Sequence, residues 1–177
     1  MASLSDRPGL LKVQGWCHAQ EMKLLKRNSV FLVGLLTLCP LLAAQEAGYW
    51  RALGSNARSI TGDVSLSSEK ISINLSTSYW MAQIRALTPA ERSAVFGVDL
   101  NAPGSGSLYR LNIPGNKRFA HKNTLCGGED VKWMATQTDG RTLQLAFFSS
   151  SRAPVLTQDA LSNSDSTSLC GVFQYQH

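Results

Sequence analysis

Two cysteines in the second half of the chain stand in the same local setting. Cys126 and Cys170 are each preceded by Leu and followed by Gly. A cysteine pair can form a disulfide, bind a metal or supply a nucleophilic thiol. A metal site would need His121 as a further ligand, and the paired close spacing of zinc motifs is missing. The glycines give the backbone freedom for a close approach, so a disulfide is the favoured chemistry if the compartment is oxidising.

The N-terminal region indicates such a compartment. Residues 22–44 start with three basic residues, continue with an apolar run of about 15 residues and end in Ala43-Ala44. This order is typical of a secretory signal peptide, and the apolar run is shorter than the about 20 residues that span a bilayer. Processing near Ala44 would remove Cys17 and Cys39. We therefore predict one disulfide between the two remaining cysteines, in a periplasmic or secreted protein.

Two alternatives to a cleaved signal peptide stay open, namely an uncleaved membrane anchor and a lipid anchor on Cys39. The lipid anchor is disfavoured because Leu38, rather than a small residue, precedes that cysteine. Residues 1–21 fit no signal and are expected to be a leader that is either non-native or mis-annotated, in the latter case with translation starting at Met22. The expected organisation is thus a leader at 1–21, a signal peptide at 22–44 and one β domain at 45–177, with no stable transmembrane span after processing.

Histidines that could activate a nucleophile are few in residues 45–177. His121 lies in a basic stretch, where we expect it to be solvated, and His177 ends the chain, where we expect it to be frayed. The Gly-Ser-Gly-Ser run at 104–107 has neither the spacing of a hydrolase nucleophile elbow nor the Lys of a phosphate loop. A hydrolytic triad is therefore not predicted.

Carboxylates offer a second route to catalysis, because paired acids can act as general acid and base. Glu129 and Asp130 are adjacent, so they would point to opposite sides of an extended chain. Asp63 follows a glycine, and we expect it to bond the local backbone of a turn. We therefore predict that the protein is not an enzyme, and we predict no catalytic residue, metal or cofactor.

The sequence offers two groups of candidate binding residues, a basic stretch and the tryptophans. A basic stretch places three cations beside an aromatic ring and is a possible contact for an anionic envelope component. Its members are Lys117, Arg118, Phe119 and Lys122. The tryptophans at 50, 80 and 133 lie in strand-like segments and are expected in the core, although an exposed one near an arginine could anchor a partner.

The charge of the chain excludes a strongly basic surface. Of 17 basic and 12 acidic residues, five and two lie in residues 1–44, which leaves 12 and 10 in the β domain. A nucleic-acid groove needs a more concentrated positive field, so no nucleic-acid partner is predicted.

Alternating apolar residues predict the elements that carry these side chains. Strands are expected at 49–54, 64–66, 71–75, 79–87, 108–113, 131–137, 143–147 and 169–175. Asp139-Gly140 is a strong hairpin signal, because glycine accepts the positive φ of the turn. Thr88, Pro89 and Glu91 predict the start of one short helix through a capping box, and 157–168 reads as a surface loop. The fold class is therefore all-β, a small antiparallel barrel or sandwich with one short helix and one disulfide.

Three stretches of the chain also resemble a known group of proteins. They are YWRALGSNARSITGDVSLSSEKISI from Tyr49, LAFFSSSRAPVL from Leu145 and LCGVFQY from Leu169. They are similar to small exported bacterial all-β proteins of unassigned function, and the resemblance implies a compact β domain but no activity. Small periplasmic lysozyme inhibitors are similar in size, compartment and single disulfide, but their functional loop has no residue-by-residue counterpart here.

These observations predict an exported, non-enzymatic binding or inhibitor module whose partner is an unidentified protein or envelope component. One alternative is an envelope hydrolase with a site of carboxylates and arginine. It would show an open pocket with two converging carboxylates, whereas a filled barrel with an aromatic patch favours binding. The other alternative is a structural component of an envelope complex, which would expose a large apolar surface.

Overall fold

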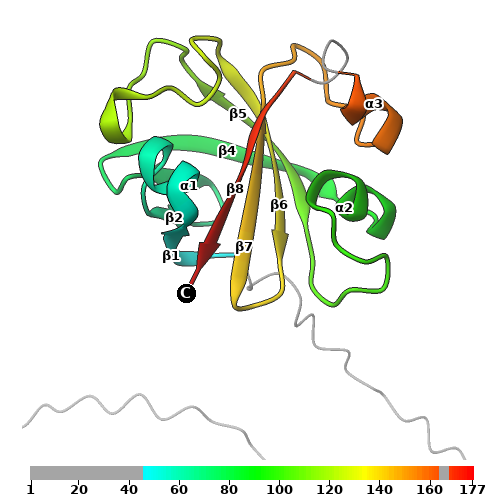
Figure 1. The fold of residues 1–177 in the computed structure, drawn as a ribbon. Coiled ribbons are helices and arrows are strands. Elements are labelled where there is room, and N and C mark those ends of the chain that lie inside the picture. Colours follow the sequence, from blue (N-terminus) through cyan, green and yellow to red (C-terminus); the bar gives the residue numbers. More distant parts are fainter. Residues whose placement is uncertain (1–45, 164–167) are drawn as a thin grey trace, which may run out of the picture. The chain divides into compact units, whose positions relative to one another are not determined.

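The computed structural model describes residues 46–163 and 168–177 of the 177-residue chain. The predicted leader and signal peptide lie outside these residues. Within them the chain forms an antiparallel β-barrel with a few short helices (Figure 1). The strands are β1 (Gly48–Leu53), β2 (Val64–Leu66), β3 (Lys70–Ile73), β4 (Thr77–Ala86), β5 (Ser107–Ile113), β6 (Val131–Thr138), β7 (Thr142–Phe148) and β8 (Leu169–Gln176). The helices are α1 (Gly54–Ile60), α2 (Pro89–Phe96), α3 (Gln158–Ser162) and the 3₁₀ turn η1 (Ala120–Lys122).

The barrel is closed and its strands follow one another in chain order from β1 to β8. Closure depends on β1, which pairs with β2 through residues 48–50 and with β8 through residues 51–53. The predicted fold class is thereby confirmed, and the choice between barrel and sandwich is resolved in favour of the barrel.

Large side chains fill the barrel interior. An eight-stranded barrel has an interior just wide enough to be filled by side chains, and here most inward positions are apolar, with Ser107, Thr136 and Thr138 as buried polar exceptions on β5 and β6. The largest fully buried ones include Trp50, Ile71, Ile73, Met134, Leu143, Leu145, Phe147 and Tyr175. The Tyr175 hydroxyl bonds Thr61 Oγ1 at 2.7 Å, which satisfies a polar group in this core. Burial raises the pKa of Tyr175, so the phenol stays protonated.

A second, smaller core lies outside the barrel wall. It packs Val95 of α2 and Leu156 against outward residues of β5 to β7, among them Leu108, Ala146 and Phe148. This contact covers one side of the barrel and leaves the outer side of β3 and β4 free of helices. The capping box predicted for α2 is present, with Glu91 N–H donating to Thr88 Oγ1 at 3.3 Å and the Glu91 carboxylate accepting from Thr88 N–H at 2.9 Å.

Two further α-helices were not expected. The α1 segment GSNARSI buries only Ala57, so its helix leaves no apolar periodicity to recognise in the sequence. The α3 helix lies in the segment 157–168, for which we expected a surface loop. It is capped by the Thr157 side chain, which accepts from Ala160 N–H at 3.3 Å. Leu75 was expected to continue the third strand but is 58% exposed in a turn with φ of 53°.

The predicted disulfide between Cys126 and Cys170 is present. It joins the first residues of β8 to the segment that precedes β6. The end of β8 is held separately, because the Trp50 and His177 rings stack with their centroids 3.8 Å apart and His177 N–H donates to Arg141 O at 3.2 Å. The expectation that His177 is frayed was therefore wrong.

Replacing both Cys126 and Cys170 with Ser should lower the free energy of unfolding by up to about 4 kcal/mol, because the bridge closes a loop of 44 residues in the unfolded chain. Urea denaturation of the purified protein measures the difference. The native protein treated with dithiothreitol is the control and should match the double variant. A double variant as stable as the oxidised protein would contradict the stabilising role of this bridge.

Candidate binding surfaces

The outward side of β3 to β6 carries two cation–aromatic pairs. We call it the outer β3–β6 face and define it by Lys70, Trp80, Ala82, Ile84, Arg110 and Trp133. The Lys70 ammonium lies 4.0 Å from the centre of the Trp80 ring, and the Arg110 guanidinium lies 4.8 Å from that of Trp133. Such pairs contribute about 0.5–1 kcal/mol each at exposed sites. The face is therefore organised before any partner is present.

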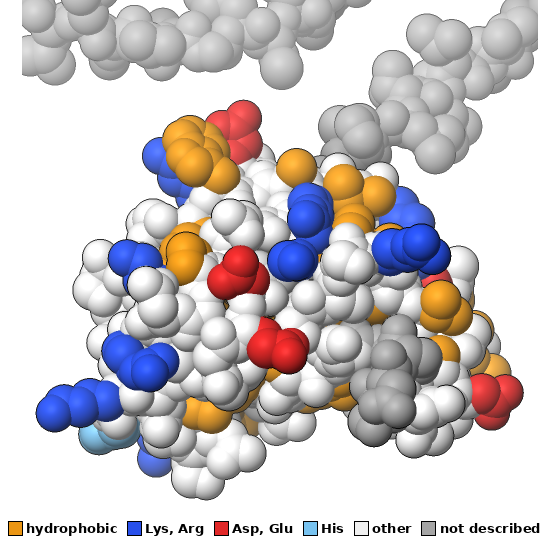
Figure 2. Space-filling view, turned by 90° about the horizontal axis from the view of Figure 1, so that it is seen from above, with side chains coloured by type: hydrophobic (Ala, Val, Ile, Leu, Met, Phe, Trp, Pro, Cys, Tyr) orange, Lys and Arg blue, Asp and Glu red, His pale blue; other side chains and the backbone are white. Residues whose placement is uncertain are grey.

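Strand register places these residues beside one another. Lys70 pairs with Trp80 between β3 and β4, Ala82 pairs with Arg110 between β4 and β5, and Arg110 pairs with Trp133 between β5 and β6. The side chains therefore share one side of the sheet. Figure 2, which looks down on Figure 1 from above, shows hydrophobic side chains along the upper edge of the molecule, with both basic and acidic side chains beside them.

Trp80 contradicts the expectation that the tryptophans belong to the core. It is 66% exposed, whereas Trp50 is fully buried and Trp133 is half-buried. On β4 the inward positions are taken by Tyr79 and Met81, so the alternation of the strand turns Trp80 outward.

The basic stretch predicted as a partner contact lies between β5 and β6. Lys117, Arg118 and Lys122 are exposed there, while Phe119 is half-buried and packs edge-on against Tyr79 with ring centroids 6.3 Å apart. The structure thus keeps the three cations on the surface but turns the aromatic ring inward. Their role in partner binding stays a prediction.

This stretch is also held in place by α1. Asn123 Nδ2 donates to Ser59 O at 2.9 Å, and Phe119 N–H donates to Asn123 O at 3.0 Å. His121 is exposed, as expected, with φ of 52°. The stretch is therefore a fixed, charged protrusion over α1.

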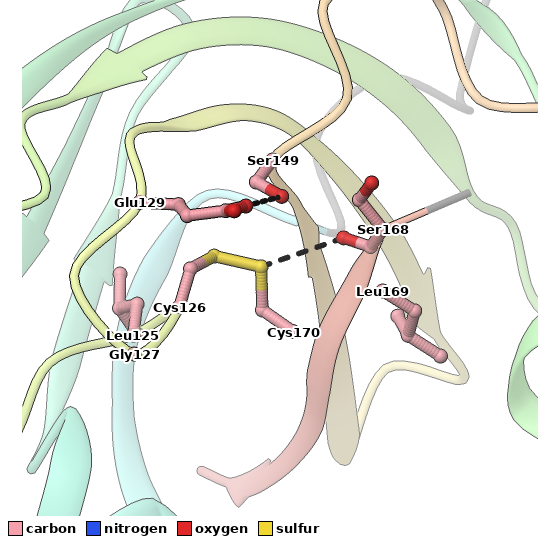
Figure 3. Close-up of a pocket in the computed structure, with 8 residues that line it drawn as sticks. All are labelled: Leu125, Cys126, Gly127, Glu129, Ser149, Ser168, Leu169 and Cys170. Carbon is pink, nitrogen blue, oxygen red and sulfur yellow. Dashed lines mark hydrogen bonds between the residues drawn. A yellow bond between two sulfur atoms is a disulfide. The ribbon is translucent and has the colours of Figure 1, made fainter. Parts of the chain in front are cut away.

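A small cleft of about 330 Å³ lies beside the disulfide. Figure 3 shows the Glu129 carboxylate facing Ser149, whose hydroxyl donates to it at 2.7 Å, with the two sulfurs alongside. Cys170 Sγ also lies 3.6 Å from Ser168 O. A serine hydrolase holds its general base with a third group, and no residue described here takes that position beside Glu129.

Two connected clefts of about 540 and 660 Å³ run beside α2 and share Ser93 and Leu100. Their walls come from α2, the segment 99–103 and the start of α3. Glu91 lines the first of them, and its carboxylate is already bonded to Arg85 and to Thr88. These clefts bring no second carboxylate beside it.

Two of the described acids, Asp63 and Asp130, are engaged by neighbouring protein groups. Asp63 accepts from the Tyr49 hydroxyl and from Ala52 N–H, so it bonds the neighbouring strand β1 rather than the local turn that was expected. Those two hydrogen bonds hold the pKa of Asp63 below its usual range. Asp130 accepts from Gly115 N–H at 2.7 Å. These contacts give each acid a structural role.

Glu46 occupies the mouth of the barrel. Its carboxylate accepts from Tyr109 Oη at 2.6 Å and from Ser107 Oγ at 3.3 Å, and its carbonyl accepts from Trp50 Nε1 at 3.1 Å. Burial and the bond to this carboxylate raise the pKa of Tyr109. No signal in the sequence identified this contact, because the two partners are more than 60 positions apart in the chain.

Among residues 46–163 and 168–177, no three His, Cys, Asp or Glu side chains come together as a metal-binding group. The same residues contain no helix of the length and apolarity needed to cross a membrane. Comparison with family models, curated proteins and solved structures finds no match to this chain. The resemblance to small exported proteins therefore stays a prediction, and function has to be argued from the surface itself.

The ion pair that borders the outer β3–β6 face should make stability sensitive to acid. Arg85 and Glu91 are joined at 2.6 Å, and the hydrogen bond from Arg85 lowers the pKa of Glu91 from 4.5 to about 2. A lowered pKa stabilises the fold above the unfolded value of 4.5, and this contribution is lost as the pH falls towards 2. Replacing Glu91 with Gln should therefore flatten the fall in melting temperature between these pH values.

The matched control is Glu69→Gln, which removes a carboxylate from an exposed turn. It should leave the acid dependence close to that of the native protein. An unchanged acid profile for Glu91→Gln would show that this ion pair does not contribute to stability.

Proposed function

We propose that this protein is an exported, non-enzymatic binding module that holds an envelope component on its outer β3–β6 face. The exposure of Trp80 beside Lys70 is the observation that carries the proposal. A tryptophan 66% exposed on a regular strand leaves a large apolar surface in water, and such residues commonly dominate binding energy in recognition surfaces.

The filled interior supports binding at the outside of the barrel. Inward positions are occupied by side chains such as Trp50, Phe147 and Tyr175, each less than 2% exposed. A barrel that carries a small molecule needs interior space for it. In this barrel the interior is filled by side chains that stabilise the fold, so we place partner binding on the outer surface.

The arrangement of the carboxylates supports binding over hydrolysis. A hydrolase of the carboxylate type needs two acids about 5–10 Å apart across a substrate cleft. Asp63, Glu91 and Glu129 each sit in a separate setting with their own hydrogen-bond partners. A structural role in a complex would require an apolar surface larger than Trp80, Ala82 and Ile84 provide.

Export is supported by the signal-like order of residues 22–44 and by the disulfide. A bridge between Cys126 and Cys170 persists in oxidising compartments and is rare in the cytosol. We accordingly propose that the protein is located in the periplasm or outside the cell.

Trp80→Ala should abolish partner recovery if the outer β3–β6 face binds. The full chain, carrying a C-terminal tag and left to be processed by the cell, is used to capture partners from envelope extract. The native protein should recover a component that Trp80→Ala loses, because the truncation removes the apolar anchor. Leu100→Ala is the matched control, since Leu100 is 58% exposed on a different surface and should recover the component unchanged.

Recovery of nothing by the native protein, together with turnover of an envelope substrate, would instead favour the hydrolase. Recovery that is equal for native protein and Trp80→Ala would move the binding site away from this face. The mass of the processed protein tests export in the same preparation, since it should lack residues 1–44.

A further inference from the structure

The outer β3–β6 face points to the chemical nature of the envelope component. We propose that it is the anionic headgroup surface of a phospholipid membrane, to which the protein binds peripherally. This inference rests on the proposed function, because it assumes that the same face is the binding surface.

All charged side chains of the four strands are basic. Strands β3 to β6 contain Lys70, Arg85, Arg110 and Lys132 and no Asp or Glu. Arg85 is paired with Glu91, whereas the other three form no salt bridge among the described residues. The nearest acids in sequence, Glu69 and Asp130, lie in the connections that precede β3 and β6. An anionic surface is therefore the complementary partner, and each cation near such a surface contributes about 1 kcal/mol.

Apolar side chains project from the same strand. Trp80 and Ala82 alternate on the outward side of β4, and Ile84 lies at the register shift that follows them; Trp80 and Ile84 are 66% and 53% exposed. Tryptophan prefers the headgroup level of a bilayer because its ring is apolar and its N–H is polar. The Lys70 ammonium over the Trp80 ring places a cation at that same level. Together these residues match an interfacial anchor.

The shape of the face favours a membrane over the other candidates. The outside of a closed barrel is convex, and the clefts beside the disulfide and α2 are lined by other residues. A convex surface cannot enclose a small glycan or nucleotide. A stable protein partner usually buries about 800 Å² on each side around an apolar centre, whereas a deformable lipid surface needs only a few anchoring residues.

Vesicle co-sedimentation tests the proposal with the purified processed protein. The probes are vesicles of phosphatidylcholine alone and vesicles with phosphatidylglycerol added. The protein should bind only the anionic vesicles, and added salt should weaken binding because it screens the charges. Trp80→Ala should weaken binding roughly tenfold, since the apolar area that enters the interface is lost.

Two double variants with the same change in net charge separate this face from the basic stretch. Lys70→Gln with Arg110→Gln should weaken vesicle binding by about 25-fold, or about fivefold for each cation. Lys117→Gln with Lys122→Gln should leave binding within about twofold, because these cations lie elsewhere.

The proposal is overturned if the protein binds neither vesicle, if it binds both equally, or if only the basic-stretch variant loses binding. Soluble glycerol phosphate should not compete, because a single headgroup offers no surface for Trp80; effective competition would indicate a small anionic ligand and would also contradict membrane binding. If vesicles are not bound but capture of an envelope protein still depends on Trp80, the membrane proposal fails and the binding module stands. If neither depends on Trp80, both fail.

Discussion

The antiparallel pairing of β1 with β8 is the contact on which the rest of the structure depends. It joins the first and last strands of the described sheet through residues 51–53 and 174–176 and turns an open sheet into a barrel. Closure removes both sheet edges, which would otherwise present unpaired backbone groups to other chains. It is a contact between residues more than 120 positions apart, so it forms only after much of the chain has been brought together.

Several side chains support this closure from different directions. Trp50 fills the interior from β1 and stacks on the terminal His177, while Asp63 binds the backbone of β1 at Ala52. The disulfide at Cys170 holds the other end of β8. The stack joins the two ends of the described chain to each other, and the disulfide joins β8 to the segment before β6, so both ends are held in the folded domain.

Closure also determines where recognition can occur. Because the interior is filled, the binding that we propose would take place at the outer wall, and part of that wall is covered by α2 and by the segment around Leu156. The uncovered side presents Trp80 and its neighbouring cations. The surface that we propose for binding is thus the part of the outer wall that the helix α2 and the segment around Leu156 do not cover.

The local parts of this fold could be predicted from the sequence, because local signals define them. The Asp139-Gly140 hairpin, the capping box of Thr88 and Glu91, and the disulfide each follow from residues with a direct physical role. The sequence does not show which side of β4 faces the interior. Both sides of its first half carry large apolar residues, so the alternation of apolar and polar residues does not distinguish the buried side from the exposed one.

Contacts between distant segments could not be predicted from the sequence either. The bond of Glu46 to Tyr109 and the stack of His177 on Trp50 join residues that only the closed barrel brings together. A single sequence contains no local signal for them. The candidate binding surface was missed for a related reason, because its members come from four strands whose register, with shifts between β4 and β5 and between β5 and β6, has no local signal in the sequence.

Hydrogen exchange of the backbone amides tests closure most directly. In the closed barrel, the amides that pair β1 with β8, at residues 51, 53, 174 and 176, should exchange as slowly as those between β6 and β7, because all of them open only with the whole barrel. Fast exchange at these positions, with slow exchange retained between β6 and β7, would show an open sheet and would contradict the account.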